Sequence, residues 1–544
     1  MSIIDQTNPH SVIGEPLTHE RMATELVATE TLTPDSDTAE SSIAARPRGR
    51  LALFVTSGAG SLGLLIGGIY ALVGSRPLYD NSFLTHLATG RVILERGLPE
   101  VNPFLYSSSS FPVPSYWWSI IVAAVEKVGS GVGLRLMTAL LAGLLGLLIV
   151  RLGSFTAQHQ PAPGQILDGA RQPDRGTKTV LAVLVPTLLT TVCVLPFLNS
   201  RPQLPGFILL ALAVLIWNER RSPWWLVPIF VAWVNIHGTW LYGIAVLGLF
   251  MVAEVIESRR IERTRLASVL AAIGGTVLGG ALYPKPFEIM LLPTRQFGNE
   301  IEREALRMYI EWRPVATSDP MFWLLIGLGL VAIYGNVAGS SGVSGRRWAS
   351  AISAVGLVLM GLSGYRLVPV AAIALVPLVS SSLSNLGSIP MFKGRVAVAV
   401  SILGALLFGA SMINALVGPS YDLEMYPVKL VDRMVAADVI GGDIRSLTHD
   451  YAGNYLEWRL GERSNTFVDD RPGAETFLAY GAMLKLKSGW QDVLAEANPD
   501  VILWKHKEEF AGELRGSKDW FYAGKVDGWD LFCAKDLAAS CARN

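Results

Sequence analysis

Residues 51–74 read LALFVTSGAGSLGLLIGGIYALVG and contain no charged side chain. About 20 apolar residues are enough to cross the hydrocarbon layer of a bilayer, so this run predicts a transmembrane helix. Arg46, Arg48 and Arg50 precede it, and basic residues before a first span favour a cytoplasmic N-terminus. The run begins too late and is too long for the apolar segment of a signal peptide.

The composition of the whole chain supports a membrane protein. Of its 544 residues, 51% are hydrophobic and only 17% are charged, against about 25% charged in soluble domains, and the mean hydropathy is +0.39. The 45 Lys and Arg residues balance 45 Asp and Glu residues, so no basic excess is present to bind nucleic acid. Three cysteines are too few for a disulfide framework or a four-cysteine zinc site.

Hydropathy predicts a polytopic α-helical membrane protein with about eleven transmembrane helices. After the first span, ten further apolar runs lie at about 132–150, 179–198, 204–218, 224–236, 239–257, 266–283, 321–337, 348–364, 367–382 and 396–417. Alternate connections carry basic clusters: Arg151/Arg171/Arg175/Lys178, Arg220/Arg221, Arg259/Arg260/Arg263/Arg265, Arg346/Arg347 and Lys393/Arg395. Eleven spans from a cytoplasmic start place all of these clusters inside. The predicted location is therefore the cell's inner (plasma) membrane, with an extracytoplasmic C-terminus.

One segment, residues 224–257, is open to two interpretations. It could form one long helix or two short helices hinged at His237-Gly238. A single helix would place the cluster from Arg259 to Arg265 outside, against the positive-inside tendency. We therefore expect the hinged pair, with a first helix that is short for a span.

Three regions outside the spans complete the predicted organisation. Residues 1–45 are polar and predict a disordered cytoplasmic tail. The first outer loop, at about 75–130, predicts a helix from Asp80 to Gly97, a proline-rich extended path, and an interfacial amphipathic helix that begins at Tyr116-Trp117-Trp118. A second large outer loop covers about 284–320.

The last region, residues 418–544, predicts an extracytoplasmic α/β domain with a partly parallel sheet. Its expected helices lie near 427–439, 450–460, 474–496 and 507–515, and its expected strands at Ile444–Thr448, Asn465–Val468, Val501–Trp504 and in a hairpin over Trp520–Cys533. Asp527-Gly528 is the hairpin's type I′ turn signal. Outside the cytoplasm Cys533 and Cys541 could form a disulfide or remain free.

Polar residues next to apolar spans are expensive to place and need a partner or a purpose. Asp80 follows the first span closely, and it could take a proton from an acceptor hydroxyl or cap the following helix. His86 and Arg91 lie further along that helix and could bind substrate or form a solvated face. His237, at the hinge, could be a hydrogen-bonded turn residue or a contact to substrate or metal.

A resemblance to a known superfamily comes from this loop. The segment Tyr79–Arg91, YDNSFLTHLATGR, followed by Gly97–Phe104, GLPEVNPF, resembles the first outer loop of bacterial membrane proteins related to the GT-C glycosyltransferases. Looser similarity continues in Arg201-Pro202-Gln203, Asn235-Ile236-His237-Gly238 and Glu311-Trp312-Arg313-Pro314. Many members carry two acidic residues in the first loop, whereas here Asn81 follows Asp80.

The resemblance implies Asp80 as the catalytic carboxylate and a polyprenyl-phosphate-linked sugar as the donor. Loss of a phosphate leaving group requires positive charge beside it, from arginines or a divalent cation. Arg201 and Arg366, at outer ends of spans, are the expected phosphate contacts or else interfacial anchors. Arg313 and Lys285 lie in the second outer loop.

Two further groups have equally open roles. Glu311 could pair locally with Arg313 or shape the sugar pocket. Asp469, Asp470 and Arg471 could face an acceptor sugar or form a turn before Pro472.

The predicted function is therefore a membrane glycosyltransferase that acts on an envelope glycan or glycolipid acceptor among membrane lipids. Asp80 is its expected base, with His86, Arg91, Arg201, His237, Arg313 and Arg366 as substrate-binding residues. A transporter or flippase of lipid-linked saccharides is a second class, although such proteins usually show internal repeats and midplane charges. A non-catalytic envelope assembly protein is a third, and Asn81 in place of a second acid supports it.

Overall fold

The fold is known from a computed structural model that describes residues 55–159, 180–338, 347–384, 391–471 and 473–542. These residues belong to one compact unit. The tail predicted for residues 1–45, and Arg46, Arg48 and Arg50, lie outside the described residues. The proposed boundary of a separate domain at residue 418 stays a prediction.

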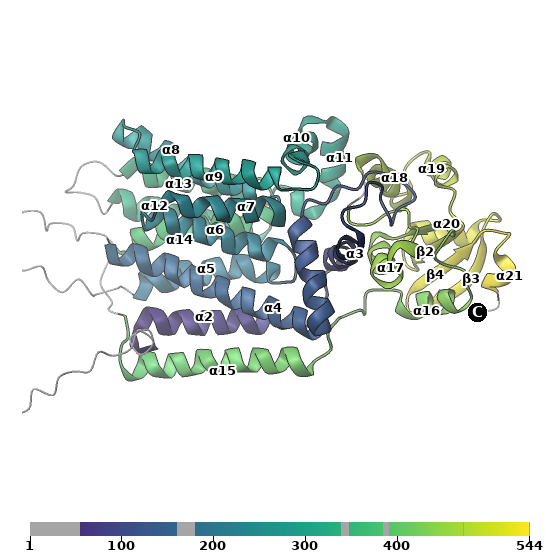
Figure 1. Cartoon of the computed structure of the whole chain (residues 1–544), viewed down its shortest axis with the longest axis horizontal. Coiled ribbons are helices and arrows are strands. Elements are labelled where there is room, and N and C mark those ends of the chain that lie inside the picture. The colour runs from purple at the N-terminus through teal and green to yellow at the C-terminus, as the bar shows by residue number, and fades with distance from the viewer. Residues whose placement is uncertain (1–54, 160–179, 339–346, 385–390, 472, 543–544) are drawn as a thin grey trace, which may run out of the picture. The chain divides into compact units, whose positions relative to one another are not determined.

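Apolar helices between residues 58 and 417 form a bundle (Figure 1). Among the described residues, six helical segments are long and apolar enough to cross a membrane, and five shorter apolar helices of 10–17 residues accompany them. This arrangement is that of a multi-pass membrane protein. The bundle helices are α2 (Gly58–Gly74), α4 (Tyr116–His159), α5 (Val180–Val194), α6 (Gln203–Asn218), α7 (Leu226–Ile236), α8 (Trp240–Ser258), α9 (Arg263–Ala281), α12 (Pro320–Ala338), α13 (Arg347–Leu362), α14 (Val368–Ser384) and α15 (Arg395–Val417).

Each of these helices overlaps one of the predicted apolar runs, and two details of the prediction are confirmed. The 224–257 segment is two helices, because α7 ends at Ile236 and His237 has an extended backbone (φ −159°, ψ 141°). The interfacial helix and the following span are continuous in α4 except for a break at Ser130, where φ is 53°.

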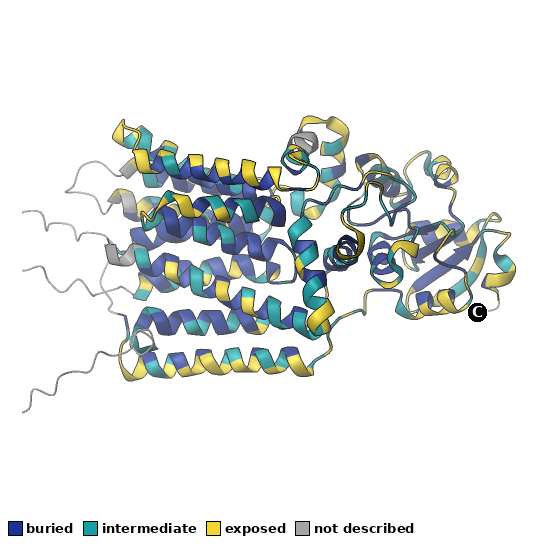
Figure 2. Cartoon of the chain, viewed as in Figure 1, coloured by how far each residue is buried: buried dark blue, intermediate teal, exposed yellow. Residues whose placement is uncertain are grey.

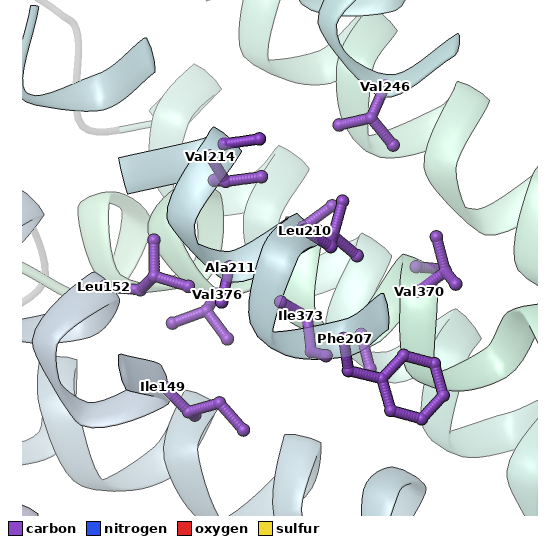
Figure 3. Packing of buried hydrophobic residues seen from close by; sticks show 14 of the residues in the cluster. Ile149, Leu152, Phe207, Leu210, Ala211, Val214, Val246, Val370, Ile373 and Val376 are labelled. Carbon is purple, nitrogen blue, oxygen red and sulfur yellow. The ribbon is translucent and has the colours of Figure 1, made fainter. Parts of the chain in front are cut away.

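Tight packing holds the bundle together, since lipid provides no hydrophobic drive for helices to associate. Fully or almost fully buried aliphatic side chains from α4, α6, α8 and α14 meet in its centre (Figure 3). Glycines let α2 approach the helices on either side of it (Figure 1): a Cβ on Gly67 would lie 3.1 Å from the Gly143 carbonyl of α4, and one on Gly68 would lie 2.6 Å from the Gly404 carbonyl of α15.

The first outer loop contains helix α3 (Asn81–Arg96), as predicted. Asp80 caps its start and Gly97, with φ 82°, ends it. Gly90 brings α3 directly against α4, because a Cβ there would lie 1.9 Å from the Ser119 carbonyl oxygen. The second outer loop, which was not assigned any helices, contains α10 (Glu288–Gly298), α11 (Glu300–Met308) and the short turn η3 (Ile310–Trp312).

The C-terminal region carries a four-stranded sheet in the order β1-β2-β4-β3. Strands β1 (Ser446–Thr448) and β2 (Val501–Lys505) are parallel, whereas β3 (Phe521–Val526) and β4 (Trp529–Cys533) form the antiparallel hairpin. Both turn residues of the hairpin have positive φ, as a type I′ turn requires. The helices are α16 (Val428–Ala436), α17 (Asp450–Leu460), α18 (Ala474–Leu484), α19 (Trp490–Ala497), α20 (Glu509–Gly516) and α21 (Ala538–Cys541).

Two predictions for this region are wrong in detail, and one open question is answered. Residues 465–468 do not form a strand: Thr466 makes single bridges to Leu105 and Ser446, and the Asp469 side chain then accepts the Arg471 N–H and turns the chain. The 474–496 helix is divided by positive φ at Leu486 and Gly489. Cys533 and Cys541 form a disulfide.

Candidate functional site

Asp80 lies in the short connection between α2 and α3 and is 8% exposed. Its Oδ1 accepts the Phe83 N–H at 3.3 Å, which makes it the N-cap of α3. Its Oδ2 accepts two further bonds, from Arg201 Nε at 2.6 Å and from Asn199 Nδ2 at 3.1 Å. The carboxylate therefore serves as a helix cap and as an ion-pair partner at the same time.

Arg201 joins two carboxylates from distant parts of the chain. It lies between α5 and α6, 121 residues from Asp80, and its Nη1 also pairs with Glu311 of η3, 110 residues further along. Burial alone would raise the pKa of Glu311, but the charges of Arg201 and Arg366 outweigh it and lower that pKa. Glu311 thus pairs with Arg201 across the fold, and the local pair with Arg313 expected as one alternative does not form.

His237 and Arg366 make a second contact beside this one. Arg366 Nη2 lies 3.1 Å from His237 Nε2, and its guanidinium lies 4.3 Å above the Trp312 ring. A guanidinium can only donate, so Arg366 donates to Nε2, while Nδ1 lies 2.8 Å from the Thr239 hydroxyl and 3.3 Å from the Thr239 backbone nitrogen, whose N–H donates to it. Burial, followed by the charge of Arg366, holds the pKa of His237 well below its ordinary value, so this imidazole stays neutral.

Asp470 brings a carboxylate from the C-terminal region to the same place. Its N–H donates to Asn454 Oδ1 at 2.9 Å, and its carboxyl group accepts a hydrogen bond from Ser82 in the first turn of α3. Burial raises the pKa of Asp470 to about 7: Arg201 and Ser82 oppose this rise, while Asp469 and Asp80 add to it. We call Asp80, Arg201, His237, Glu311, Arg366 and Asp470 the Asp80 cluster.

His86 lies beside this cluster without a direct bond to its members. Its Nδ1 is 3.2 Å from the Ser119 hydroxyl of α4. Loss of water around the ring, together with the charges of Arg471 and Arg201, lowers the pKa of His86 to about 3. His86 is therefore neutral over the physiological pH range.

Arg91 and Arg313, both predicted substrate contacts, are placed elsewhere. Arg91 donates from Nε and Nη2 to Glu126 at 2.8 and 2.6 Å, and from Nη1 to the Trp458 carbonyl. Arg313 is exposed, and its Nε donates to the Arg307 carbonyl at 2.8 Å. The structure thus brings Asp80, Arg201, His237 and Arg366 together but leaves these two arginines out.

The cluster does not fit a divalent cation. Both oxygens of Asp80 already accept hydrogen bonds. Within the described ranges, no group of three or more His, Cys, Asp or Glu side chains is arranged to hold a metal ion. We therefore derive no step through a metal here.

Space beside Asp80 is small. The cavity between Tyr79, Asp80, Phe83 and Asn199 measures about 10 Å³, roughly the room of one water molecule. A sugar would require side chains to move. Tyr79 is 47% exposed, and it can move without breaking an ion pair of the Asp80 cluster.

No protein-family model and no curated protein sequence matches this chain. What the cluster can do must therefore be argued from its own chemistry.

Proposed function

We propose that this protein is a membrane glycosyltransferase of the GT-C kind, which moves a sugar from a polyprenyl-phosphate donor to a hydroxyl group of an envelope glycan or glycolipid. The convergence of the Asp80 cluster carries this proposal. Three carboxylates, two arginines and a histidine meet there, and the arginine contacts among them join residues 121, 110 and 129 positions apart. Buried charge of this kind is costly and marks functional positions in membrane proteins.

Arg366 is the group best suited to receive the donor phosphate. Among the described residues it has no carboxylate within hydrogen-bonding distance, and its one polar side-chain contact is the neutral His237. Its remaining N–H groups are available for phosphate oxygens, which a guanidinium fork binds in pairs. Arg201 is instead neutralised by Asp80 and Glu311, so its role is to position these two carboxylates.

The proton of the acceptor hydroxyl needs a base. Asp80, the base predicted from the sequence, already accepts hydrogen bonds at both carboxylate oxygens, one of them from the Arg201 guanidinium. Asp470 lies next to it, and loss of solvent around its carboxyl group raises its pKa to about 7, near the optimum for proton transfer at neutral pH. We therefore assign the proton to Asp470: as the acceptor oxygen bonds to the sugar carbon, the bond from that carbon to the phosphate oxygen breaks, and the negative phosphate faces Arg366.

The topology that goes with this function is the eleven-span arrangement. Counting the five shorter apolar helices with the six long ones gives eleven crossings. The N-terminus is then cytoplasmic, and the Asp80 cluster and the C-terminal α/β region lie outside the inner membrane. A lipid-linked donor and an envelope acceptor would meet on that side.

The test is transfer by the purified protein in nanodiscs, with a synthetic short-chain polyprenyl-phosphate hexose and glycolipids extracted from a deletion strain. We expect transfer by the wild type and a loss of at least about tenfold in Asp80→Asn, which is about 1.4 kcal/mol, because Arg201 then loses one of its two carboxylate partners. Asparagine caps helices as well as aspartate does, so α3 should persist. Asp422→Asn is the matched control, because Asp422 is exposed and its carboxylate caps a local turn.

Two outcomes would overturn the proposal. Equal transfer by the wild type and Asp80→Asn would show that the Asp80 cluster does not take part in the reaction. Passage of the saccharide across reconstituted vesicles without a new covalent bond would instead assign the protein to transport.

A further inference from the structure

A second polar site lies at the other end of the bundle. Helix α8 starts next to His237 and ends 19 residues later at Ser258, which is about 28 Å at 1.5 Å per residue. A cavity of about 320 Å³ opens there between the end of α6, the end of α8 and the starts of α9 and α13. This volume is in the range of small-molecule sites. We call it the Arg260 pocket, after one of the three arginines that line it.

Among the described residues that line the pocket, positive and negative side chains are equal in number. Arg220, Arg260 and Arg265 line it together with Glu254, Glu257 and Glu262. Three of these contacts are already made: Arg220 pairs with Glu262 at 3.0 Å, Arg265 pairs with Glu254 at 3.1 Å, and Glu257 accepts the Ala349 N–H at 2.8 Å. A ligand with a net charge would upset this balance, whereas a zwitterion would not.

Unused hydrogen-bond donors remain in the pocket. Arg265 is 7% exposed and uses Nε for Glu254 and Nη1 for the Trp217 carbonyl; its Nη2 has no acceptor within the described part of the chain. The Asn218 Nδ2 is buried and has no hydrogen-bond partner there either. The Arg260 guanidinium, on the rim, makes no ion pair with a described residue. These three donors can receive an anionic oxygen group.

Acceptors for a cation are present at the same site. Each carboxylate in the two ion pairs uses one oxygen for its arginine, and the side chains of Glu254 and Glu262 are 35% and 42% exposed. A primary ammonium group could donate to the other oxygens. The pocket therefore offers donors for a phosphate and acceptors for an ammonium within one small volume.

The surroundings favour a lipid as the source of such a group. The last turns of α8 expose Val252 and Ile256, and α9 exposes Leu266 and Leu270 (Figure 2). Apolar side chains exposed on membrane helices contact acyl chains. The length of α8 matches the roughly 30 Å hydrocarbon layer, so the pocket lies at headgroup depth.

We propose that the Arg260 pocket binds the headgroup of a phospholipid that carries a primary ammonium group, as in phosphatidylethanolamine. Its phosphate is received by Arg260, Arg265 and Asn218, and its ammonium group by Glu254 and Glu262. This site is separate from the Asp80 cluster and does not depend on the glycosyl-transfer proposal.

Native mass spectrometry of the purified full-length protein tests this proposal, with phosphatidylethanolamine, phosphatidylcholine or phosphatidylglycerol added at matched acyl composition. We expect at least tenfold tighter binding of phosphatidylethanolamine than of the other two lipids. Arg260→Gln should weaken it about tenfold, as loss of a charged hydrogen bond does. Arg263→Gln is the matched control, because Arg263 is exposed three residues away and does not line the pocket.

The remaining outcomes contradict the proposal. Equal or tighter binding of phosphatidylglycerol would show that only an anion is recognised. If Arg260→Gln and Arg263→Gln changed the affinity for phosphatidylethanolamine equally, the lipid would not bind in the Arg260 pocket. Displacement of the lipid by soluble glycerophosphoethanolamine at a similar concentration would assign the site to a soluble phosphate ester.

Discussion

The two ends of the helical bundle are built from the same residue types in opposite ways. At the Asp80 end, the arginine contacts join residues 121, 110 and 129 positions apart. At the Arg260 end, the two ion pairs that line the pocket join residues 42 and 11 positions apart. The first set depends on the complete tertiary structure, whereas the second forms between neighbouring helix ends.

This difference indicates that the Asp80 end has the larger energetic cost of placing charged side chains. Contacts between distant, buried charges incur a desolvation cost that only good geometry offsets, and they also hold loops in fixed positions. An exposed local pair such as Arg220–Glu262 costs and contributes little, which leaves donors and acceptors available for an outside ligand. The two ends should therefore respond very differently to the same substitution.

Removing one arginine from each end gives the largest expected contrast. Arg201→Met leaves Asp80 and Glu311 without their partner, and breaking a buried pair typically lowers the free energy of unfolding by about 3–5 kcal/mol. Arg220→Met removes an arginine that is 52% exposed, and we expect a loss below about 1 kcal/mol. Thermal unfolding of both variants in the same detergent measures the difference.

Equal destabilisation by the two substitutions would contradict this comparison. A loss of transfer activity in Arg201→Met without any loss of stability would show instead that Arg201 acts directly on substrate.

The positions of the apolar helices and several residues of the Asp80 cluster could be predicted from the sequence. Hydropathy predicted where the apolar helices lie. The predicted topology placed Asp80, Arg201, His237 and Arg366 at helix ends on the outer side of the membrane, and the structure brings these four residues together. The local signals were reliable as well: the cap at Asp80 and the hairpin turn are confirmed. These features depend on short-range chemistry or on alternation of the chain across a membrane.

The partners of charged side chains that meet only in the folded structure could not be predicted from the sequence. Glu311 was weighed against its neighbour Arg313, yet it pairs with Arg201, which lies 110 residues away in the sequence. Arg91 was expected to bind substrate, yet Glu126 lies opposite it on α4. Asp470 reaches Ser82 because its loop is bridged to Leu105 in the first outer loop, a contact between segments several hundred residues apart.

A substitution that displaces α3 should have an effect of intermediate size on stability and transfer. Gly90→Ala would place a Cβ 1.9 Å from the Ser119 carbonyl, so α3 must shift away from α4, and overpacking of this kind costs about 1–3 kcal/mol. Because α3 carries the Asp80 cap, transfer should fall together with stability. Gly129→Ala, on α4, is the matched control, because nothing lies within 4 Å of a Cβ there. An unchanged unfolding temperature in Gly90→Ala would show that the contact between the two helices is not required.

The smallest expected effect concerns pH and is specific to the Asp80 end. A base must be deprotonated to act, so with the pKa of Asp470 at about 7, transfer should rise roughly tenfold between pH 6 and pH 8. Stability should change in the opposite direction. The folded pKa lies above the ordinary 3.8, so the stabilising contribution of this group is complete below about pH 4 and is lost as the pH rises through 7.

Asp470→Asn tests both the pH dependence of transfer and the pH dependence of stability. It should lower transfer, flatten the pH profile around 7, and make the variant less sensitive than the wild type to a change from pH 5 to pH 8 in thermal unfolding. Asp469→Asn is not a suitable control, because Asp469 pairs with Arg471; Asp422→Asn, exposed and outside the cluster, is the suitable one. If Asp470→Asn retains the wild-type pH profile while Asp80→Asn loses it, the proton passes to Asp80 and the ion pair with Arg201 must open during the reaction.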